Sequence, residues 1–402
     1  MNDRRLFSRD VLLISFSAFF ADLGYQGVTA LFPLFIVIRL HEPVYIYGLI
    51  TGVSFGVGSF FAFLGGRAGD RYDRKAVAIW GNLFIPFMSF SGLSGDVRLC
   101  AALFILGWWA RFFRTPARRA LMVEAVPGDL RSKAFGFLHA LDIGGGIFSA
   151  LLALFFVLLL RMPVGTVMLL SAVPLLISTL LLLFIKRDRI YPFGQSSQGV
   201  ETGNPAEAAR KKKLFIALLV AATFYGFSFY NAGFPVLTAA MSRKSGYALG
   251  LAAYVIYMGL SAASGYVFGS GKPRPVRALW TLGYLPSAIA SLLLGASVFF
   301  HLPYLAFYIF VAGLGLGMGA TETFEPTAAS FLVRSGSLST GMGWLSFTRA
   351  LGQFISNLVM GIIFSFSQSL SYLYAFAASL TAALILASAD LAMGKAADAK
   401  GK

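Results

Sequence analysis

Ten ionisable side chains lie inside stretches of this sequence that are otherwise apolar. These side chains are Asp22, Arg111, Arg114, Arg118, Arg119, His139, Asp142, Glu322, Glu325 and Arg349. Carboxylates and imidazoles in such surroundings can take up and release protons, and guanidiniums can hold anions. If the apolar stretches cross a bilayer, each charge costs from about 2.5 kcal/mol upward, so each residue is a candidate functional site.

Asp22 is the first candidate for a proton-carrying group. It lies twelve residues after Asp10, which places it about 18 Å along a helix and near mid-membrane. Burial removes the hydration that favours a charged carboxylate, so Asp22 could load and release a proton near neutral pH. A permanent salt bridge to Arg111 is the structural alternative. His139 can also titrate, although a histidine beside an aspartate is more often a structural hydrogen-bond partner.

Three arginines of the segment 99–124 share one helix face, because Arg111, Arg114 and Arg118 are spaced i, i+3 and i+7. Such a row of cations needs opposing anions, and the first half of the chain offers Asp22 and Asp142. We expect Arg114 or Arg118 to pair with Asp142. The remaining guanidiniums favour an anionic or zwitterionic ligand.

The second half reverses this polarity. Glu322 and Glu325 lie one turn apart in the segment 304–332, and Arg349 lies in the segment 340–366. We expect Glu325 to pair with Arg349, and a single arginine then leaves one of the two carboxylates without a partner. We expect Glu322 or Asp22 to be protonated in at least one state. Both expected pairs are either structural clamps or contacts that break when a proton or substrate binds. No cysteine and no second histidine lie near the two glutamates, so no metal site is expected.

The elements that carry these residues are long apolar segments. The chain of 402 residues is 57% hydrophobic and 12% charged, with a mean hydropathy of +0.75. A soluble globule carries roughly a quarter charged residues, so the composition predicts a polytopic membrane protein. The apolar segments are 11–38, 44–65, 76–95, 99–124, 134–160, 165–185, 214–240, 248–270, 278–300, 304–332, 340–366 and 370–390. They predict an all-α fold of twelve transmembrane helices.

The distribution of basic residues predicts the orientation. Of the 33 Lys and Arg, 23 fall in segments on one side of the expected helices, five fall on the other side, and five lie within helices. By the positive-inside rule both termini are cytoplasmic. The net charge of +16 then faces anionic lipid headgroups rather than nucleic acid.

The chain also divides into two similar halves. The hydrophilic stretch Lys186–Lys213 separates the sixth and seventh apolar segments, and we expect bundles of six helices at 1–190 and 214–402, joined by a linker at 191–213. Pro116–Asp142 aligns without gaps on Pro326–Gly352, and the pair Tyr25 and Gln26 aligns on Tyr230 and Asn231. The two bundles are therefore expected to be pseudo-symmetric repeats.

A charged segment of ten residues, Gly66–Lys75, lies between two apolar runs and is expected to be a cytoplasmic turn. It resembles the signature loop of the major facilitator superfamily, G-x-x-x-D-R-x-G-R-[RK]. The matching residues are Gly66, Asp70, Arg71, Arg74 and Lys75, and Asp73 stands where the pattern has its second glycine. The segment 114–142 is similar to a subgroup of that superfamily, with matches at Arg114, Arg118 and Asp142.

This resemblance implies a secondary transporter that works by alternating access, with helices 1, 4, 7 and 10 around a central cavity. Polar residues of helices 1 and 7 are then the first candidates for cargo contacts: Tyr25, Gln26, Tyr225, Tyr230 and Asn231, together with Arg111, Arg114, Arg118 and Arg349. The signature loop and its counterpart Lys272–Arg277 would gate the cytoplasmic side. We expect Asp70 to contact the cytoplasmic start of the helix at 340–366, whose N-terminal dipole favours an anion.

Several functions remain open at this stage. The first is proton-coupled transport of a small organic solute, with Asp22, Asp142, Glu322, Glu325 and His139 as candidate proton sites. The alternatives are a drug/proton antiporter that exports apolar compounds and an uncoupled facilitator. A transporter-like receptor or a lipid scramblase is a further possibility. The stretch Asp142–Ala150 lacks the proline typical of antiporters of this superfamily, and this makes the drug/proton antiporter a less favoured interpretation.

The remaining expectations concern partners and location. No P-loop, haem motif or nucleophile elbow is present, so neither an enzyme nor an ATP-driven pump is expected. We expect no cofactor, and as partners a small-molecule substrate, protons and membrane lipid, but no nucleic acid. The protein is expected to be a monomer that crosses the cytoplasmic (inner) membrane many times. The sequence does not name a cargo.

Overall fold

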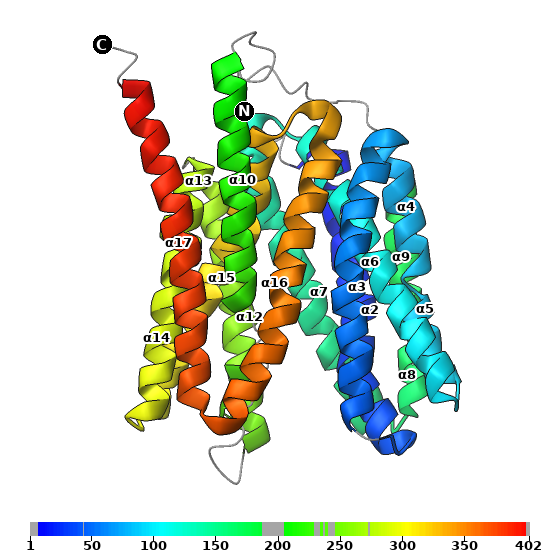
Figure 1. Ribbon diagram of the computed structural model, residues 1–402. Coiled ribbons are helices and arrows are strands. Elements are labelled where there is room, and N and C mark those ends of the chain that lie inside the picture. Colours follow the sequence, from blue (N-terminus) through cyan, green and yellow to red (C-terminus); the bar gives the residue numbers. More distant parts are fainter. Residues whose placement is uncertain are drawn as a thin grey trace. The chain divides into compact units, whose positions relative to one another are not determined.

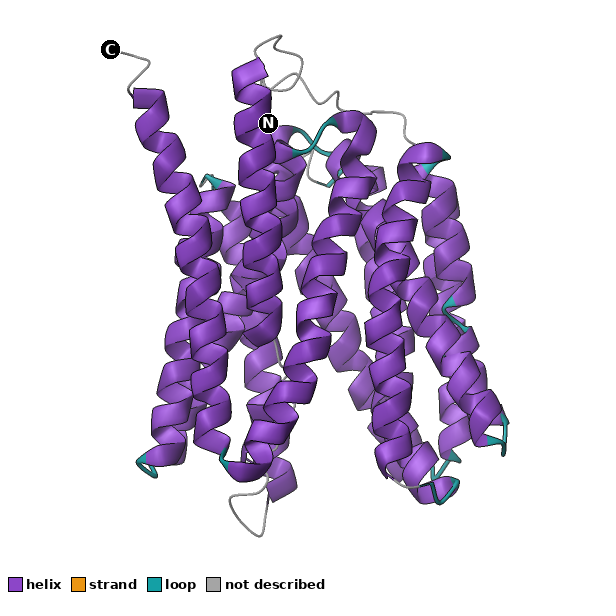
Figure 2. Cartoon of the chain, viewed as in Figure 1, coloured by secondary structure: helices purple, strands orange, loops and turns teal. Residues whose placement is uncertain are grey.

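The computed structural model describes residues 7–42, 44–186, 205–228, 234–235, 238–239, 246–271 and 274–398. All regular elements in these residues are helices, and none is a strand (Figure 2). Figure 1 traces them along the chain. The helices of the first half are α2 (Arg9–Leu34), extended by η1 (Phe35–Arg39); α3 (Val44–Arg71); α4 (Arg74–Phe84), continued by α5 (Phe87–Phe90) and η2 (Ser91–Leu93); α6 (Val97–Ala125); α7 (Arg131–Leu154), extended by η4 (Phe155–Leu159); and α8 (Val164–Leu170), continued by α9 (Ala172–Leu183).

The second half repeats this plan. Its helices are α10 (Pro205–Ser228); α12 (Gly246–Ser270); α13 (Pro275–Ala278), continued by the π-helical η5 (Leu279–Tyr284) and by α14 (Leu285–Phe299); α15 (Tyr304–Leu332); α16 (Leu338–Phe366); and α17 (Gln368–Asp398). Ten helical stretches among the described residues are long and apolar enough to cross a membrane. α6 and α10 complete the twelve helices, and the predicted all-α membrane fold is confirmed.

The contacts divide the chain into two compact units. Unit 1 comprises Met1–Pro127, Leu141–Phe193 and Ser335–Phe347, and unit 2 comprises Gly128–Ala140, Gly194–Arg334 and Thr348–Lys402. Each unit is mainly one half of the chain, but the first part of α7 belongs to unit 2 and the first part of α16 belongs to unit 1. The expected bundles at 1–190 and 214–402 follow the chain without this exchange, and residues 187–204 of the expected linker lie outside the described residues.

Close helix packing in both units depends on small residues. In unit 1, α3 packs on α6, and the carbonyl of Phe113 occupies the place that a side chain on Gly65 would need. In unit 2, α12 packs on α15, and the carbonyl of Ser261 does the same at Gly319. Because apolar side chains gain little by leaving lipid for another helix, such close approach supplies the dispersion contacts that hold membrane helices together.

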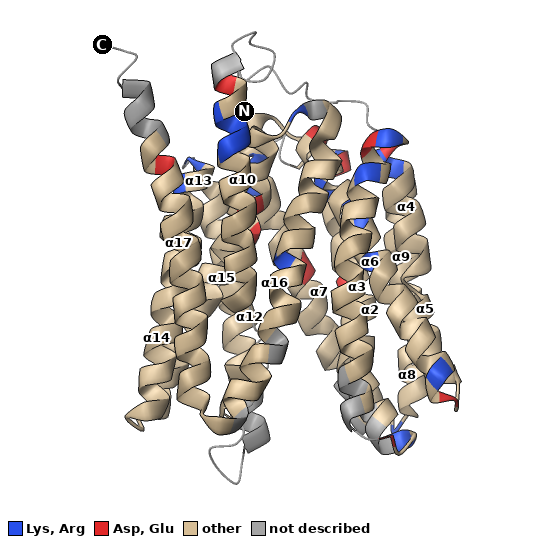
Figure 3. Cartoon of the chain, in the orientation of Figure 1, with Lys and Arg blue, Asp and Glu red and all other residues tan. Residues whose placement is uncertain are grey.

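The expected turn at Gly66–Lys75 is largely helical, which corrects the sequence-based expectation. α3 continues through the charges to Arg71, and only Tyr72 and Asp73 separate it from α4. Asp73 has extended backbone (φ −154°), and its side chain accepts a hydrogen bond from the amide of Ala76 at 2.7 Å. Asp73 therefore caps α4 at the position where the superfamily pattern has glycine. Figure 3 shows the cluster of both charge signs at this junction.

Candidate functional site

Asp22 of α2 is buried in unit 1, with 5% of its surface exposed. It accepts a hydrogen bond from the hydroxyl of Tyr25, one turn further along α2. Above the Tyr25 ring lies the guanidinium of Arg111 from α6, whose Cζ is 4.7 Å from the ring centroid. Asp22 and Arg111, both among the described residues, form no direct salt bridge, so the structural alternative is not found. Instead, the phenol links the carboxylate to the cation.

Arg111 is held by aromatic rings on two sides. Its Cζ is also 4.9 Å from the ring of Trp108, and Trp108 packs against Tyr25 with 5.8 Å between ring centroids. Cation–π contacts of this kind fix the plane of a guanidinium without neutralising its charge. Arg111 keeps intermediate exposure, unlike the buried Arg114 and Arg118. Of the three arginines on this face of α6, it is the most exposed.

The other two arginines have different partners. Arg118 Nη2 lies 3.3 Å from Oδ2 of Asp142 on α7, so the expected ion pair is confirmed with Arg118. Arg114 does not pair with Asp142. It lies four residues before Arg118 on α6, is 1% exposed, and donates at 2.5 Å to the side-chain oxygen of Asn82 on α4.

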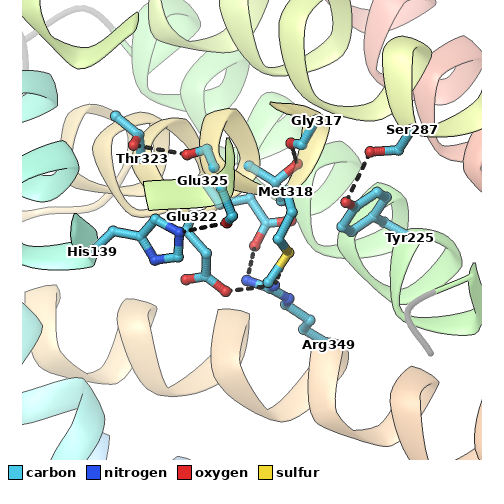
Figure 4. Close-up of polar contacts among 12 residues, drawn as sticks. His139, Tyr225, Ser287, Gly317, Met318, Glu322, Thr323, Glu325 and Arg349 are labelled. Carbon is cyan, nitrogen blue, oxygen red and sulfur yellow. Dashed lines mark hydrogen bonds and ion pairs between the residues drawn. The ribbon is translucent and has the colours of Figure 1, made fainter. Parts of the chain in front are cut away.

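In unit 2, Arg349 of α16 binds two carboxylates of α15 (Figure 4). Its Nη2 is 2.6 Å from Glu322, and its Nη1 is 3.2 Å from Glu325. The expected pair between Glu325 and Arg349 is confirmed, but the expectation that one of the two carboxylates lacks a partner is wrong. Spacing of i, i+3 places both carboxylates on one helix face, and a guanidinium has donors on both edges.

Glu325 is 0% exposed and receives a second hydrogen bond from the hydroxyl of Tyr284, at 2.7 Å. Tyr284 stacks on Tyr225 of α10 with 4.6 Å between ring centroids, and the Tyr225 hydroxyl lies 3.1 Å from that of Ser287. Tyr225, which the sequence predicts as a cargo contact, is therefore buried against α13–α14. Glu325 is satisfied as a charged group, whereas the side chain of Glu322 is 17% exposed.

His139 of α7 belongs to unit 2, where its Nε2 lies 2.8 Å from the hydroxyl of Ser261 on α12. The ring is 7% exposed. Gln26 on α2 is partly exposed and lies beside Gly146 of α7. Two further expected cargo contacts, Tyr230 and Asn231, lie outside the described residues, so the expected repeat of Gln26 by Asn231 stays a prediction.

Asp70 lies at the start of α16, as the sequence predicted. Its two carboxylate oxygens accept the amides of Ser339 at 2.9 Å and Thr340 at 2.5 Å, within unit 1. The first amides of a helix have no partners inside the helix, and the helix dipole favours an anion beside them. Arg74 also binds Asp70, at 2.6 Å, and reaches Glu124 at 2.5 Å.

The other signature residues surround this cap. A side chain on Gly66 would lie 2.6 Å from the carbonyl of Ser339, so only glycine permits the approach of α3 to α16. Lys75 donates to the carbonyls of Leu183 and Ile185 at the end of α9, at 2.9 and 2.6 Å. Arg71 lies over the exposed ring of Tyr72. In the counterpart segment Lys272–Arg277, Lys272 and Pro273 lie outside the described residues.

We expect Asp70→Ala to expose the first amides of α16. Loss of an N-cap costs about 1 kcal/mol, so hydrogen exchange at Ser339 and Thr340 should become roughly five- to tenfold faster in the full-length protein. Asp70→Asn should show a smaller effect, because asparagine also caps helices. Asp73→Asn, a change at the neighbouring cap of α4, is the control. Unchanged exchange at both amides in Asp70→Ala would show that this contact does not hold the helix start.

Sequence reasoning missed three partners of the site: Asn82, Tyr284 and Ser261. Asn82 had a signal, since it is the one side-chain amide in the apolar segment 76–95. Tyr284 and Ser261 had none, because the sequence has many tyrosines and serines. No group of three His, Cys, Asp or Glu side chains that could hold a metal occurs among the described residues.

Comparisons with known proteins agree with this architecture. The family model described as Major Facilitator Superfamily matches residues 14–357. An uncharacterized MFS-type transporter of Methanocaldococcus jannaschii is 24% identical over 390 residues, which are 96% of each chain.

Solved structures show the same fold. The proton:xylose symporter XylE has a TM-score of 0.74 at 13% identity and covers 96% of both chains. The human organic anion transporter MFSD10 (TETRAN) has a TM-score of 0.73 at 13% identity and covers 94% of this chain and 99% of its own. The E. coli fucose:proton symporter FucP has a TM-score of 0.68 at 14% identity, over 94% of this chain and 98% of its own. The protein is therefore not an enzyme but a multi-pass secondary transporter, and it belongs to the major facilitator superfamily.

Proposed function

We propose that this protein is a proton-coupled secondary transporter of the cytoplasmic membrane, which moves a small organic solute with anionic or zwitterionic character by alternating access. The observation that carries the proposal is the Asp22–Tyr25–Arg111 cluster. A carboxylate at mid-membrane depth is costly, and Asp22 has a neutral phenol rather than a cation as its hydrogen-bond donor. Such a group can exchange its proton without breaking an ion pair.

The other buried charges support this assignment by contrast. Asp142 faces Arg118, and Glu322 and Glu325 share Arg349, so these carboxylates have counter-ions in their own units. We assign them to stabilising the charged interior, with Glu322 as the second proton candidate because it is partly exposed. His139, hydrogen-bonded to Ser261, is the third.

The Asp70 contact supplies a gating element for the same cycle. We propose that the amides at the start of α16 leave Asp70 when the cytoplasmic side opens and return to it when that side closes. The two halves at 1–190 and 214–402 would move within a monomer, joined by the linker 191–213, while basic residues at the cytoplasmic side face lipid headgroups.

The first test is a search for the cargo in purified protein. Peptides, sugars, organic acids and drug-like cations are screened by thermal shift at two pH values, because a ligand that binds the folded state raises its apparent stability. Compounds that bind are then measured in proteoliposomes with an imposed pH gradient. Accumulation that collapses with a proton ionophore supports coupling. Accumulation that ignores the gradient indicates a facilitator, and pH-driven export of apolar dyes indicates the antiporter.

A further inference from the structure

The charges on one face of α6 are not balanced within unit 1. Arg111, Arg114 and Arg118 lie on this face, and the carboxylates that act on them are Asp22 and Asp142. Three cations facing two anions leave one positive charge when both carboxylates are ionised. A net positive charge at this face attracts an anion, and the attraction is stronger when one of the two carboxylates is protonated.

The same face holds buried donors that have no acceptor among the described residues. Arg114 Nε has no hydrogen-bond partner, and Arg118 Nε and Nη1 also have none among the described residues. Among the described residues, the hydrogen-bond acceptor of Arg114 is Asn82, which carries no charge. An unpaired buried donor destabilises a structure, and an anion is the ligand that satisfies several such donors at once.

Arg111 is the member of this face that a solute can contact. The rings of Tyr25 and Trp108 hold its guanidinium, and its Nε is enclosed without a partner. The rest of the side chain keeps intermediate exposure at a depth where the surroundings are either lipid or a polar interior. A cation at that depth faces the polar interior, because lipid cannot solvate it.

Asp22 controls how strongly Arg111 attracts an anion. Four groups act electrostatically on Asp22: Tyr25 on its own helix, Arg111 and Arg118 on α6, and Asp142 on α7. When Asp22 is ionised, it competes with an external anion for the field of Arg111. When Asp22 is protonated, that competition ends and the Tyr25 hydroxyl no longer faces a charged acceptor.

We propose that unit 1 binds an organic monoanion at Arg111 together with one proton at Asp22, so that both cross the membrane as an electroneutral pair. This inference rests on the proposed function and specifies its cargo and stoichiometry. The proton converts the Asp22 carboxylate to a carboxylic acid, and the anion adds one negative charge beside Arg111. The occupied site thus has the same net charge as the unoccupied one, and no other group has to change its charge.

The proposal fixes the sign of the pH dependence. Because protonated Asp22 favours the anion, affinity for a monoanion rises as the pH falls, by about tenfold if the two sites interact by one pKa unit. A competing site, in which the anion displaces the proton, gives the opposite sign and describes an antiporter. A site without coupling gives no pH dependence.

Binding to the full-length protein in detergent tests this directly. The probes are benzenesulfonate and benzoate as monoanions, benzamide as the neutral analogue and benzylamine as the cation. Benzenesulfonate stays ionised at about pH 5.5 and about pH 7.5, so any pH dependence of its binding belongs to the protein. We expect both monoanions to bind, more tightly at the lower pH, and the other two compounds not to bind.

Two variants and their matched controls locate the effect. Asp22→Asn imitates the protonated state and should bind benzenesulfonate tightly at both pH values. Arg111→Gln should lose binding by roughly tenfold or more, in line with the loss of a charge-assisted hydrogen bond. Asp10→Asn, at the start of α2, and Arg98→Gln, in the exposed first turn of α6, should behave as the unmodified protein. Size-exclusion profiles establish that each variant is folded.

Binding of benzenesulfonate to the unmodified protein that is weaker at the lower pH, or that does not change with pH, would overturn the inference. Loss of binding in folded Asp22→Asn would also overturn it, as would binding of benzylamine or benzamide in place of the monoanions. Failure of both monoanions to bind at tens of millimolar would do so as well. None of these outcomes decides whether transport is proton-coupled, since pH-driven transport is measured separately in proteoliposomes, and only the binding of benzylamine or benzamide would also change the proposed class of cargo. Conversely, monoanion binding without any pH-driven transport would refute the proposed function, whereas the anion site at Arg111 would remain supported.

Discussion

Replacement of Asp22 by asparagine is expected to abolish accumulation driven by a pH gradient while exchange of cargo across the membrane continues. Asparagine has nearly the shape of aspartic acid and can still bond the Tyr25 hydroxyl, but it cannot carry a proton. With a coupling of one proton per anion, a gradient of one pH unit supports about tenfold accumulation in the unmodified protein. In Asp22→Asn the ratio should fall to one.

The measurement is uptake of the bound monoanion into proteoliposomes, with and without a pH gradient, beside counterflow of labelled against unlabelled compound. Asp10→Asn, on the same helix but outside the cluster, should keep both activities. Gradient-driven accumulation that survives in Asp22→Asn would move the proton site elsewhere, first to Glu322. Loss of counterflow as well would mean that the residue is needed for the fold or for cargo binding.

The second large effect is expected at Arg349. Arg349→Gln removes the guanidinium that binds both Glu322 and Glu325, and Glu325 is fully buried. Removal of one partner from a buried ion pair costs about 3–5 kcal/mol. The neutral variant Glu322→Gln should cost much less, because Arg349 keeps Glu325 as its counter-ion and Tyr284 still bonds Glu325. Thermal unfolding of the purified variants measures the difference.

Glu325→Gln combined with Arg349→Gln is the informative double variant. If the cost of Arg349→Gln comes from an unpaired buried carboxylate, removal of Glu325 should recover much of the lost stability. A simple exchange of Glu325 and Arg349 recovers less, because it places a new carboxylate beside Glu322. A double variant no more stable than Arg349→Gln would show that the guanidinium stabilises unit 2 through packing rather than charge.

Much of this fold follows from hydropathy, and the limits of that signal are visible at particular residues. The apolar segment 99–124 became α6 at Val97–Ala125, since hydrophobic length fixes a spanning helix. At the end of α3, hydropathy failed. α3 runs five residues beyond Gly66, because the backbone hydrogen bonds of a helix do not require apolar side chains. The Asp73 cap, rather than a change in hydropathy, fixes where α4 begins.

The candidate site was predictable where charge and helix periodicity act together. Depth and charge predicted that Asp142 pairs with an arginine of α6 but left Arg114 and Arg118 as alternatives, and the structure selects Arg118. The contact of Asp70 with α16 follows from the affinity of a carboxylate for a helix N-terminus. The double contact of Arg349 depends on the rotation of α15, which spacing alone does not give. The role of Tyr284 could not be foreseen, because it depends on η5, a π-helical stretch that ends at this tyrosine, and such stretches have no sequence signal as clear as a cap.

The central claim is that a proton on Asp22 and an anion at Arg111 cross the membrane together, and proton movement tests it most directly. Proteoliposomes with an entrapped pH dye and a clamped membrane potential receive an inward gradient of benzenesulfonate, which cannot cross a bilayer as a neutral acid. The account predicts that the lumen becomes more acidic with the unmodified protein and does not change with Asp22→Asn. Uptake of benzenesulfonate with a constant or more alkaline lumen would contradict it.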